Sequence, residues 1–110
     1  MSTRARVRYA TIFIFPPAAK GKPAVVTTSP ERLSAREGDV VDWTVVDASG
    51  QADARLVSIG WQGRSPLKEE AKPFPRFTRG TVRKAKPGIY KYSVLVDGQV
   101  AFDPELEIMS

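Results

Sequence analysis

The side chains that most often carry chemistry are scarce in this 110-residue chain. It contains no His and no Cys, which excludes a Ser-His-Asp triad, a Cys nucleophile, disulfides, and imidazole or thiolate metal ligands. Four of its 12 acidic residues cluster in sequence, at Asp39, Asp42, Asp47 and Asp53. They lack the defined spacing of a catalytic carboxylate pair, and segment 47–53 is sparse in ligands for calcium. We therefore expect a protein that is not an enzyme and has no cofactor or metal.

Cations and aromatic rings alternate in one short stretch of the chain. Residues 72–91 contain seven Lys or Arg and no acid, and residues 1–30 contain five and no acid. Nucleic-acid surfaces combine cations for phosphates with rings for bases, although no recognised binding motif accompanies this stretch. The candidate surface consists of Arg76, Phe77, Arg79, Arg83, Lys84 and Lys86. The alternative is that Phe77 and Val82 point into the core while the arginines are simply solvated.

Two tryptophans are the candidates for stacking on a sugar ring. Trp43 is in phase with Val41 and Val45, which indicates a core position. Trp61 lies at the end of an apolar segment, so a core position and an exposed platform both remain open. We include Trp61 in the candidate binding surface.

The elements that must position these residues are strands, because the dominant periodicity is two. The expected strands cover 5–15, 24–28, 31–37, 40–47, 54–61, 76–83, 89–96 and 99–108, the last interrupted or edge-placed at Pro104. The first strand is expected to become buried on both faces. Residues 62–79 form a long connection, with room for one helical turn near 67–72. About seven or eight short strands predict a single all-β domain over 1–110, folded as a two-sheet Greek-key sandwich.

No segment approaches the ~18 apolar residues of a membrane span, so we expect no membrane insertion. Three arginines precede the apolar residues 10–15, as in a weak secretory signal. That apolar run is short and Pro16-Pro17 ends it, which favours a first strand over a signal peptide. We therefore expect a cytoplasmic protein.

Two motifs of this chain resemble the framework of the cupredoxins, a family of small copper-binding β-sandwiches. They are Gly38-Asp39-Val40-Val41-Asp42-Trp43 and Pro87-Gly88-Ile89-Tyr90-Lys91-Tyr92, within a resemblance that covers roughly 24–108. The resemblance implies a copper Cys near Val94, a first His near 50–54, and a second His and a Met in the hairpin over 95–100. All of these positions lack a ligand, so the resemblance indicates a copper-free cupredoxin-like or immunoglobulin-like sandwich.

A second resemblance covers the C-terminal part of the chain. The sequence Tyr90-x-Tyr-x-Val-x-Val-Asp97-Gly98, followed by Asp103-Pro104, is similar to the end of glycogen-binding carbohydrate modules. That resemblance implies sugar stacking on an exposed Trp, and Trp61 is the ring that fits this role.

We expect a non-catalytic, metal-free interaction module with a protein partner, in which residues 62–79 form the contact region. A nucleic-acid-associated protein that uses the basic segment 76–86 is the first alternative. A carbohydrate-binding module is the second. The oligomeric state stays open, because exposed sheet edges would also allow a dimer.

Overall fold

A computed structural model describes residues 5–50, 55–69 and 72–110 of the chain. These residues form nine strands: β1 (Val7–Phe15), β2 (Val25–Ser29), β3 (Arg32–Arg36), β4 (Val40–Asp47), β5 (Val57–Trp61), β6 (Phe77–Thr81), β7 (Gly88–Val96), β8 (Gln99–Phe102) and β9 (Glu105–Met109). The described residues form no helix, so no helical segment among them is long and apolar enough to cross a membrane.

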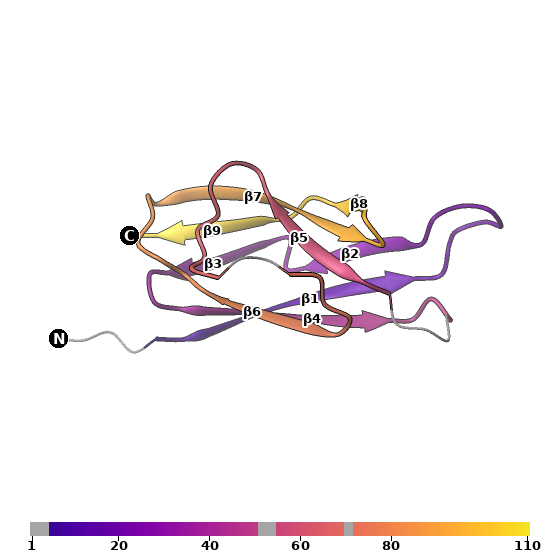
Figure 1. Cartoon of the computed structure of the whole chain (residues 1–110), viewed down its shortest axis with the longest axis horizontal. Helices are drawn as coiled ribbons and strands as arrows, with labels where there is room; N and C mark the ends of the chain where they lie inside the picture. Colours follow the sequence, from indigo (N-terminus) through magenta and orange to yellow (C-terminus); the bar gives the residue numbers. More distant parts are fainter. Residues whose placement is uncertain (1–4, 51–54, 70–71) are drawn as a thin grey trace.

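The strands form two sheets that run along the long axis of the molecule (Figure 1). One sheet has the order β2-β1-β4-β6, and the other has the order β3-β9-β7-β5 with β8 paired to β7. Strands β1 and β4 pair in parallel, as do β3 and β9, whereas the other pairs are antiparallel. The predicted all-β, two-sheet sandwich is confirmed.

One hydrophobic core lies between the sheets and includes Ile12, Trp43, Val57, Val94 and Leu106. These side chains come from alternate positions of their strands, as the period-two pattern predicts. Burying apolar side chains from both inner faces is the main favourable term in the folding of such a sandwich. The expected core position of Trp43 is confirmed, because only 1% of the residue is exposed.

Strand β1 differs from its prediction. Ala10, Ile12 and Ile14 are buried, but Tyr9 and Phe15 on the opposite side of the strand are exposed. The expectation that β1 becomes buried on both faces was therefore wrong. A run of apolar residues is compatible with burial of a strand on both faces. The second face is buried only if another element of the fold packs against it.

The connection between β5 and β6 is fastened to the sandwich at two points. Phe74 forms an isolated bridge with Val57, and Leu67 forms one with Val82. Both Phe74 and Leu67 are buried. The helical turn expected near 67–72 is absent from the described part of that segment, because Leu67 is extended and pairs with Val82.

Candidate functional site

The seven candidate residues do not form one surface. Trp61 lies within the sandwich, Phe77 and Arg79 lie on the outer side of β6, and Arg83 lies beyond the end of β6. Arg76 directly precedes β6 and is exposed, while Lys84 and Lys86 follow in the connection to β7. Three separate places therefore need to be considered.

Trp61 belongs to an aromatic cluster with Trp43 and Tyr92. Its ring centroid is 6.4 Å from that of Trp43 and 5.0 Å from that of Tyr92. The indole Nε1 of Trp43 donates a hydrogen bond of 3.1 Å to the buried Tyr92 hydroxyl. Burial raises the pKa of Tyr92 to about 12, although the bond from Trp43 acts in the opposite direction. Trp61 is half-buried against this cluster, which leaves only part of its ring available to a sugar.

The outer side of sheet β2-β1-β4-β6 carries large apolar side chains that reach solvent. We call this surface the open face and define it by Tyr9, Phe13, Phe15, Val25, Val46 and Phe77. Phe77 is 65% exposed and Tyr9 is 64% exposed. The prediction that Phe77 points inward was wrong, whereas the burial of Val82 is confirmed.

Four apolar residues of the open face are neighbours in the sheet, whereas Tyr9 pairs with Asp42 and Phe77 pairs with Thr44. Phe13 pairs with Val46 on β4, and Phe15 pairs with Val25 on β2. The rings of Phe13 and Phe15 stack with their centroids 6.0 Å apart. Side chains directly opposite each other on one face lie close enough to touch, so these four residues form a continuous apolar patch.

The open face is bordered by positive charge. Strands β1, β2 and β6 come from the two segments of the sequence that contain no acid, 1–30 and 72–91. Asp42 is the carboxylate that β4 places on this face; it is 7% exposed and accepts a hydrogen bond of 2.9 Å from Arg79 Nε. The Arg79 side chain therefore covers the Asp42 carboxylate, although Asp42 is on the outer side of β4. Arg76, which directly precedes Phe77 in the chain, is also exposed.

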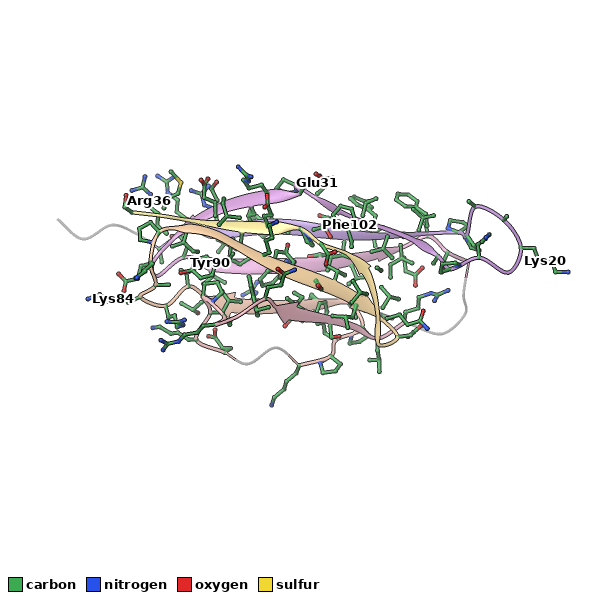
Figure 2. All side chains as sticks on the ribbon, turned by 90° about the horizontal axis from the view of Figure 1, so that it is seen from above. Lys20, Glu31, Arg36, Lys84, Tyr90 and Phe102 are labelled. Carbon is green, nitrogen blue, oxygen red and sulfur yellow. The ribbon has the colours of Figure 1, made fainter. Side chains whose placement is uncertain are left out.

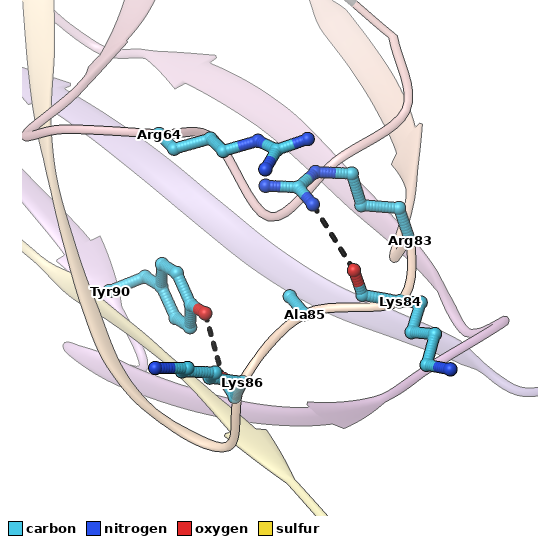
Figure 3. Close-up of a pocket in the computed structure, with 6 residues that line it drawn as sticks. All are labelled: Arg64, Arg83, Lys84, Ala85, Lys86 and Tyr90. Atoms are coloured by element: carbon cyan, nitrogen blue, oxygen red, sulfur yellow. Dashed lines mark hydrogen bonds between the residues drawn. The ribbon is translucent and has the colours of Figure 1, made fainter.

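The remaining cations of the basic stretch line an open pocket of about 550 Å³. Its lining residues are Arg64, Arg83, Lys84, Ala85, Lys86 and Tyr90 (Figure 3). The lining described by the structure thus has four cations and no carboxylate. Lys84 and Tyr90 lie toward one end of the molecule, with Lys20 at the other (Figure 2). We call this the basic pocket.

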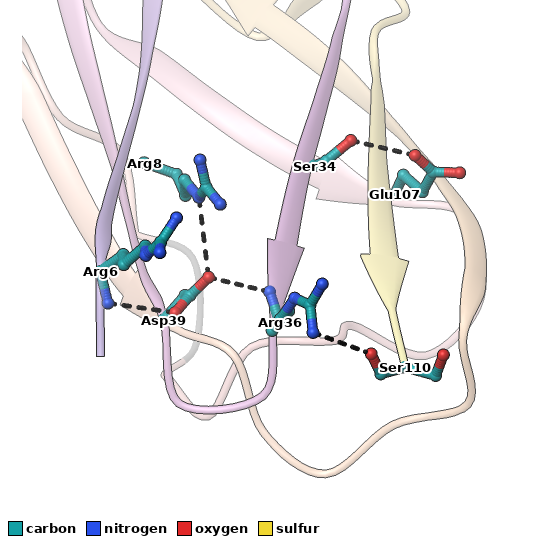
Figure 4. A network of polar contacts seen from close by, with 7 residues as sticks. All are labelled: Arg6, Arg8, Ser34, Arg36, Asp39, Glu107 and Ser110. Atoms are coloured by element: carbon teal, nitrogen blue, oxygen red, sulfur yellow. Dashed lines mark hydrogen bonds and ion pairs between the residues drawn. The ribbon is translucent and has the colours of Figure 1, made fainter. Parts of the chain in front are cut away.

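A polar network near the same end has a structural role (Figure 4). Asp39 is 5% exposed, and its two carboxylate oxygens accept hydrogen bonds from the backbone N–H of Arg6 (3.1 Å) and of Arg36 (2.9 Å). The Arg8 Nε lies 3.7 Å from Asp39 Oδ2. Gly38 precedes this Asp with φ +89°, which favours glycine. Asp39 thus stabilises the β3–β4 turn, and the network fastens the start of β1 to that turn.

No family model and no curated protein matches this sequence. Among solved structures, the chain is similar to a purple cupredoxin from Nitrosopumilus maritimus, with a TM-score of 0.53 at 16% identity over 90% of this chain and 98% of that one. A mutant of rusticyanin has a TM-score of 0.50 at 15% identity, over 97% of this chain and 80% of that one. The multicopper oxidase mgLAC has a TM-score of 0.50 at 13% identity, over 96% of this chain and 39% of that one.

The chain has a cupredoxin-like fold. The similarity concerns architecture, because the identities are too low to transfer an activity. It confirms the cupredoxin-like reading of the Gly38-Asp39 and Pro87-Gly88 motifs and favours it over the immunoglobulin-like alternative.

The residues at the ligand positions of this cupredoxin-like fold do not fit copper. Val94, which stands near the place of the family's Cys, is fully buried in the core. Asp97 occupies the β7–β8 turn and accepts hydrogen bonds of 3.2 Å from the Arg55 guanidinium and from the Leu56 backbone N–H. The entire sequence lacks His and Cys, so a type 1 copper site has neither its thiolate nor its imidazoles.

The acidic segment 47–53 that was weighed for calcium lies partly outside the described residues, since Asp53 is not described. Asp47 accepts a hydrogen bond of 2.9 Å from the Ser49 backbone N–H, as a turn residue does. Desolvation acts to raise the pKa of Asp47, but hydrogen bonding from Ser49 and the charge of Arg55 together outweigh it, so the pKa is lowered. Among the described residues, no three His, Cys, Asp or Glu side chains are placed to hold a metal ion.

Sequence reasoning missed most of the open face and two residues of the basic pocket. Tyr9, Phe13 and Phe15 were assigned to a strand that becomes buried on both faces, although their period-two phase already placed them on one side. Arg64 and Tyr90 lie outside the 76–86 segment and reach the basic pocket through the fold. No local signal in the sequence joins Arg64 to Arg83.

Proposed function

We propose that this cupredoxin-like domain is a non-catalytic protein-interaction module that binds its partner through the open face. The observation that carries the proposal is the cluster of large apolar side chains on the outer side of sheet β2-β1-β4-β6. Soluble domains normally place polar side chains on the solvent side of such a sheet. Contiguous exposed apolar patches mark interaction sites, and aromatic residues supply much of the binding energy at protein interfaces.

The charge around the open face indicates the chemistry of the partner. Arg79 lies on the open face and already neutralises Asp42, and the exposed Arg76 directly precedes Phe77 in the chain. A complementary partner surface has an apolar centre with acidic residues at its rim. A second copy of this chain would bring cations against cations at that rim, so a different protein is the better match.

Residues 62–79, the contact region expected from the sequence, contribute to this proposal only through their last part. Phe77 and Arg79 are on the open face, whereas Leu67 and Phe74 are buried and fasten the connection to the core. The proposed contact surface therefore moves from a loop to a sheet.

Site-specific photo-crosslinking tests the proposal. A photoreactive amino acid is placed at Phe77 in one variant and at Val100 in another, and each is irradiated in an extract of the source cell. Val100 is 62% exposed on β8, in the other sheet, and serves as the matched control. We expect one protein to be crosslinked from position 77 and not from position 100. Equal crosslinking from both positions, or none from position 77, would contradict the proposal.

The nucleic-acid and carbohydrate alternatives stay predictions. The cations of segment 76–86 are divided between the open face and the basic pocket, and Trp61 is packed against Trp43 and Tyr92. Neither arrangement provides the continuous basic track or the flat exposed ring that these two functions use.

A further inference from the structure

We propose that the basic pocket binds the phosphate group of a small phosphorylated ligand. This inference goes beyond the proposed function, because it concerns a different surface from the open face. It rests on unneutralised charge, on the placement of two guanidinium groups, and on an aromatic wall beside them.

The positive charge of the basic pocket is not neutralised by the described residues. Arg83 is held by neutral groups: its Nε donates to the Ser65 carbonyl (2.8 Å) and its Nη1 to the Lys84 carbonyl (3.1 Å). None of the four pocket cations forms an ion pair with a described carboxylate, since the ion pairs of the described chain involve Arg8, Arg32, Arg55 and Arg79. The pocket thus keeps a fixed cation that no described carboxylate neutralises.

The two arginines of the pocket point toward each other. Figure 3 shows the Arg64 side chain reaching from one wall and the Arg83 side chain from the opposite wall, with their guanidinium groups facing. Like charges in this arrangement repel each other, and an anion between them removes the repulsion. Guanidinium groups bind phosphate through paired, charge-assisted hydrogen bonds, and two of them can hold one phosphate group.

The frame of the pocket is fixed before a ligand arrives. The Tyr90 hydroxyl donates a hydrogen bond of 2.7 Å to the Lys86 carbonyl, which ties the β6–β7 connection to β7. The backbone N–H of Arg83 donates to the Pro66 carbonyl at 2.9 Å. A preformed site loses less conformational entropy on binding than one that must order its loops.

The size of the pocket and its tyrosine indicate a ligand larger than inorganic phosphate. A volume of about 550 Å³ lies within the range of small-molecule pockets. The Tyr90 ring lines the pocket beside the cations and offers an apolar surface to the part of the ligand that carries the phosphate (Figure 3). A small molecule with one phosphate and one flat group fits this combination.

A small ligand accounts for the arrangement better than a nucleic-acid strand. Arg76 precedes β6, whereas Lys84 and Lys86 follow its far end in the basic pocket. Arg79 lies between Arg76 and Lys84 in the sequence. Its side chain is on the outer side of β6, where its Nε donates a hydrogen bond to Asp42. A strand that tracks along the protein would need these cations in one line.

Calorimetric titration at low ionic strength tests the proposal, with inorganic phosphate, AMP and a short single-stranded RNA as probes. We expect saturable one-to-one binding of AMP, tighter than that of inorganic phosphate. Arg64→Ala should weaken AMP binding by about tenfold or more, as the loss of a charge-assisted hydrogen bond implies. Arg64 is exposed, so this variant should fold. Arg76→Ala removes the same group outside the pocket and should leave the affinity unchanged.

Nuclear magnetic resonance then locates the site: AMP should shift the amide signals of Ala85 and Tyr90 and leave that of Val100 in place. The proposal is overturned if neither phosphate nor AMP saturates. It is also overturned if Arg64→Ala and Arg76→Ala weaken AMP equally, because the attraction would then belong to the general positive field. RNA that binds more tightly than AMP and loses affinity equally in both variants would assign the cations to a nucleic-acid surface instead.

Discussion

Asp39 connects the start of β1 with the end of β3 and with the turn that follows β3. Its carboxylate satisfies the backbone N–H groups of Arg6 and Arg36 and lies beside Arg8, although the residue itself is buried. A buried backbone donor that loses its acceptor costs about 1–3 kcal/mol. The Gly-Asp pair that resembles the cupredoxin framework therefore serves the fold and needs no metal to explain it.

We predict that Asp39→Ala lowers the free energy of unfolding by about 1–3 kcal/mol, because two partly buried backbone donors lose their acceptor. Asp39→Asn keeps one acceptor oxygen and should cost roughly half as much. Urea unfolding followed by tryptophan fluorescence measures both variants. Equal stabilities for wild type and Asp39→Ala would show that the network does not fasten β1 to the turn.

Tyr92 gives the molecule a pH dependence in the alkaline range. Its folded pKa is about 12, above the ordinary tyrosine pKa of 10.0, because burial disfavours the phenolate. A raised folded pKa means that the native state holds its proton more tightly than the unfolded state. This contribution to stability is complete below pH 10.0 and is lost as the pH rises toward about 12.

The corresponding prediction compares wild type with Tyr92→Phe. Tyrosinate absorbance should show one group in the wild type that titrates near pH 12 and is missing in the variant. The variant should also lose less stability than the wild type between pH 10 and 12. Since Trp43 Nε1 loses its acceptor, Tyr92→Phe should be less stable at neutral pH, by about 1–3 kcal/mol. Identical alkaline titrations of the two proteins would contradict the assignment.

Single residues could be predicted from the sequence where a strand fixed their phase. Trp43 was placed in the core correctly, because it alternates with the polar residues Asp42 and Thr44. Phe77 was placed incorrectly beside Val82, since an odd separation of five puts two residues of an extended segment on opposite sides. The basic pocket could not be predicted from the sequence. The bridge between Leu67 and Val82 brings Arg64 close to Arg83, and no local sequence pattern indicates that bridge.

At the scale of elements, the β5–β6 connection packs tightly against β6. Gly80 lies under Leu67: a Cβ added at Gly80 would be 2.6 Å from Leu67 Cδ1 and 3.3 Å from its Cβ. Leu67 is 9% exposed and covers this part of β6. The glycine is thus required by close approach rather than by an unusual φ.

We predict that Gly80→Ala costs about 1–3 kcal/mol of stability through overpacking. In Gly80→Ala with Leu67→Ala, the combined loss should be smaller than the sum of the two single losses, because the new methyl group occupies vacated space. Gly60→Ala is the matched control, since its Cβ would make an ordinary contact of 3.5 Å with Leu95. Additive losses in the double variant would show that the connection is not packed on β6.

The strands themselves were largely predictable. Turn residues such as Gly38 and Asp97-Gly98 separated them correctly, and Pro104 divided the last segment into β8 and β9. The period-two pattern shows which residues share a face of a strand, but it does not show whether another element covers that face. For this reason the outer side of β1 was expected to be buried, and the open face became visible only in the structure.

At the scale of the whole molecule, the cupredoxin-like sandwich separates its candidate surfaces from the ligand positions of its relatives. The β7–β8 turn, where the family resemblance places copper ligands, is closed by Arg55 and Asp97. The basic pocket involves the β6–β7 connection, which lies at the other end of β7 from the β7–β8 turn (Figure 1). The open face covers the outer side of one sheet. These surfaces can therefore be altered one at a time.

The most direct test of the central claim is a paired measurement of stability and partner binding on Tyr9→Ser, Phe77→Ser and Val100→Ser. All three side chains are more than 60% exposed, so each variant should stay within about 0.5 kcal/mol of the wild-type unfolding free energy. Binding of the protein identified by crosslinking should fall by about tenfold or more for Tyr9→Ser and Phe77→Ser, and remain unchanged for Val100→Ser. Unchanged binding in both open-face variants, or an equal loss in all three, would contradict the account.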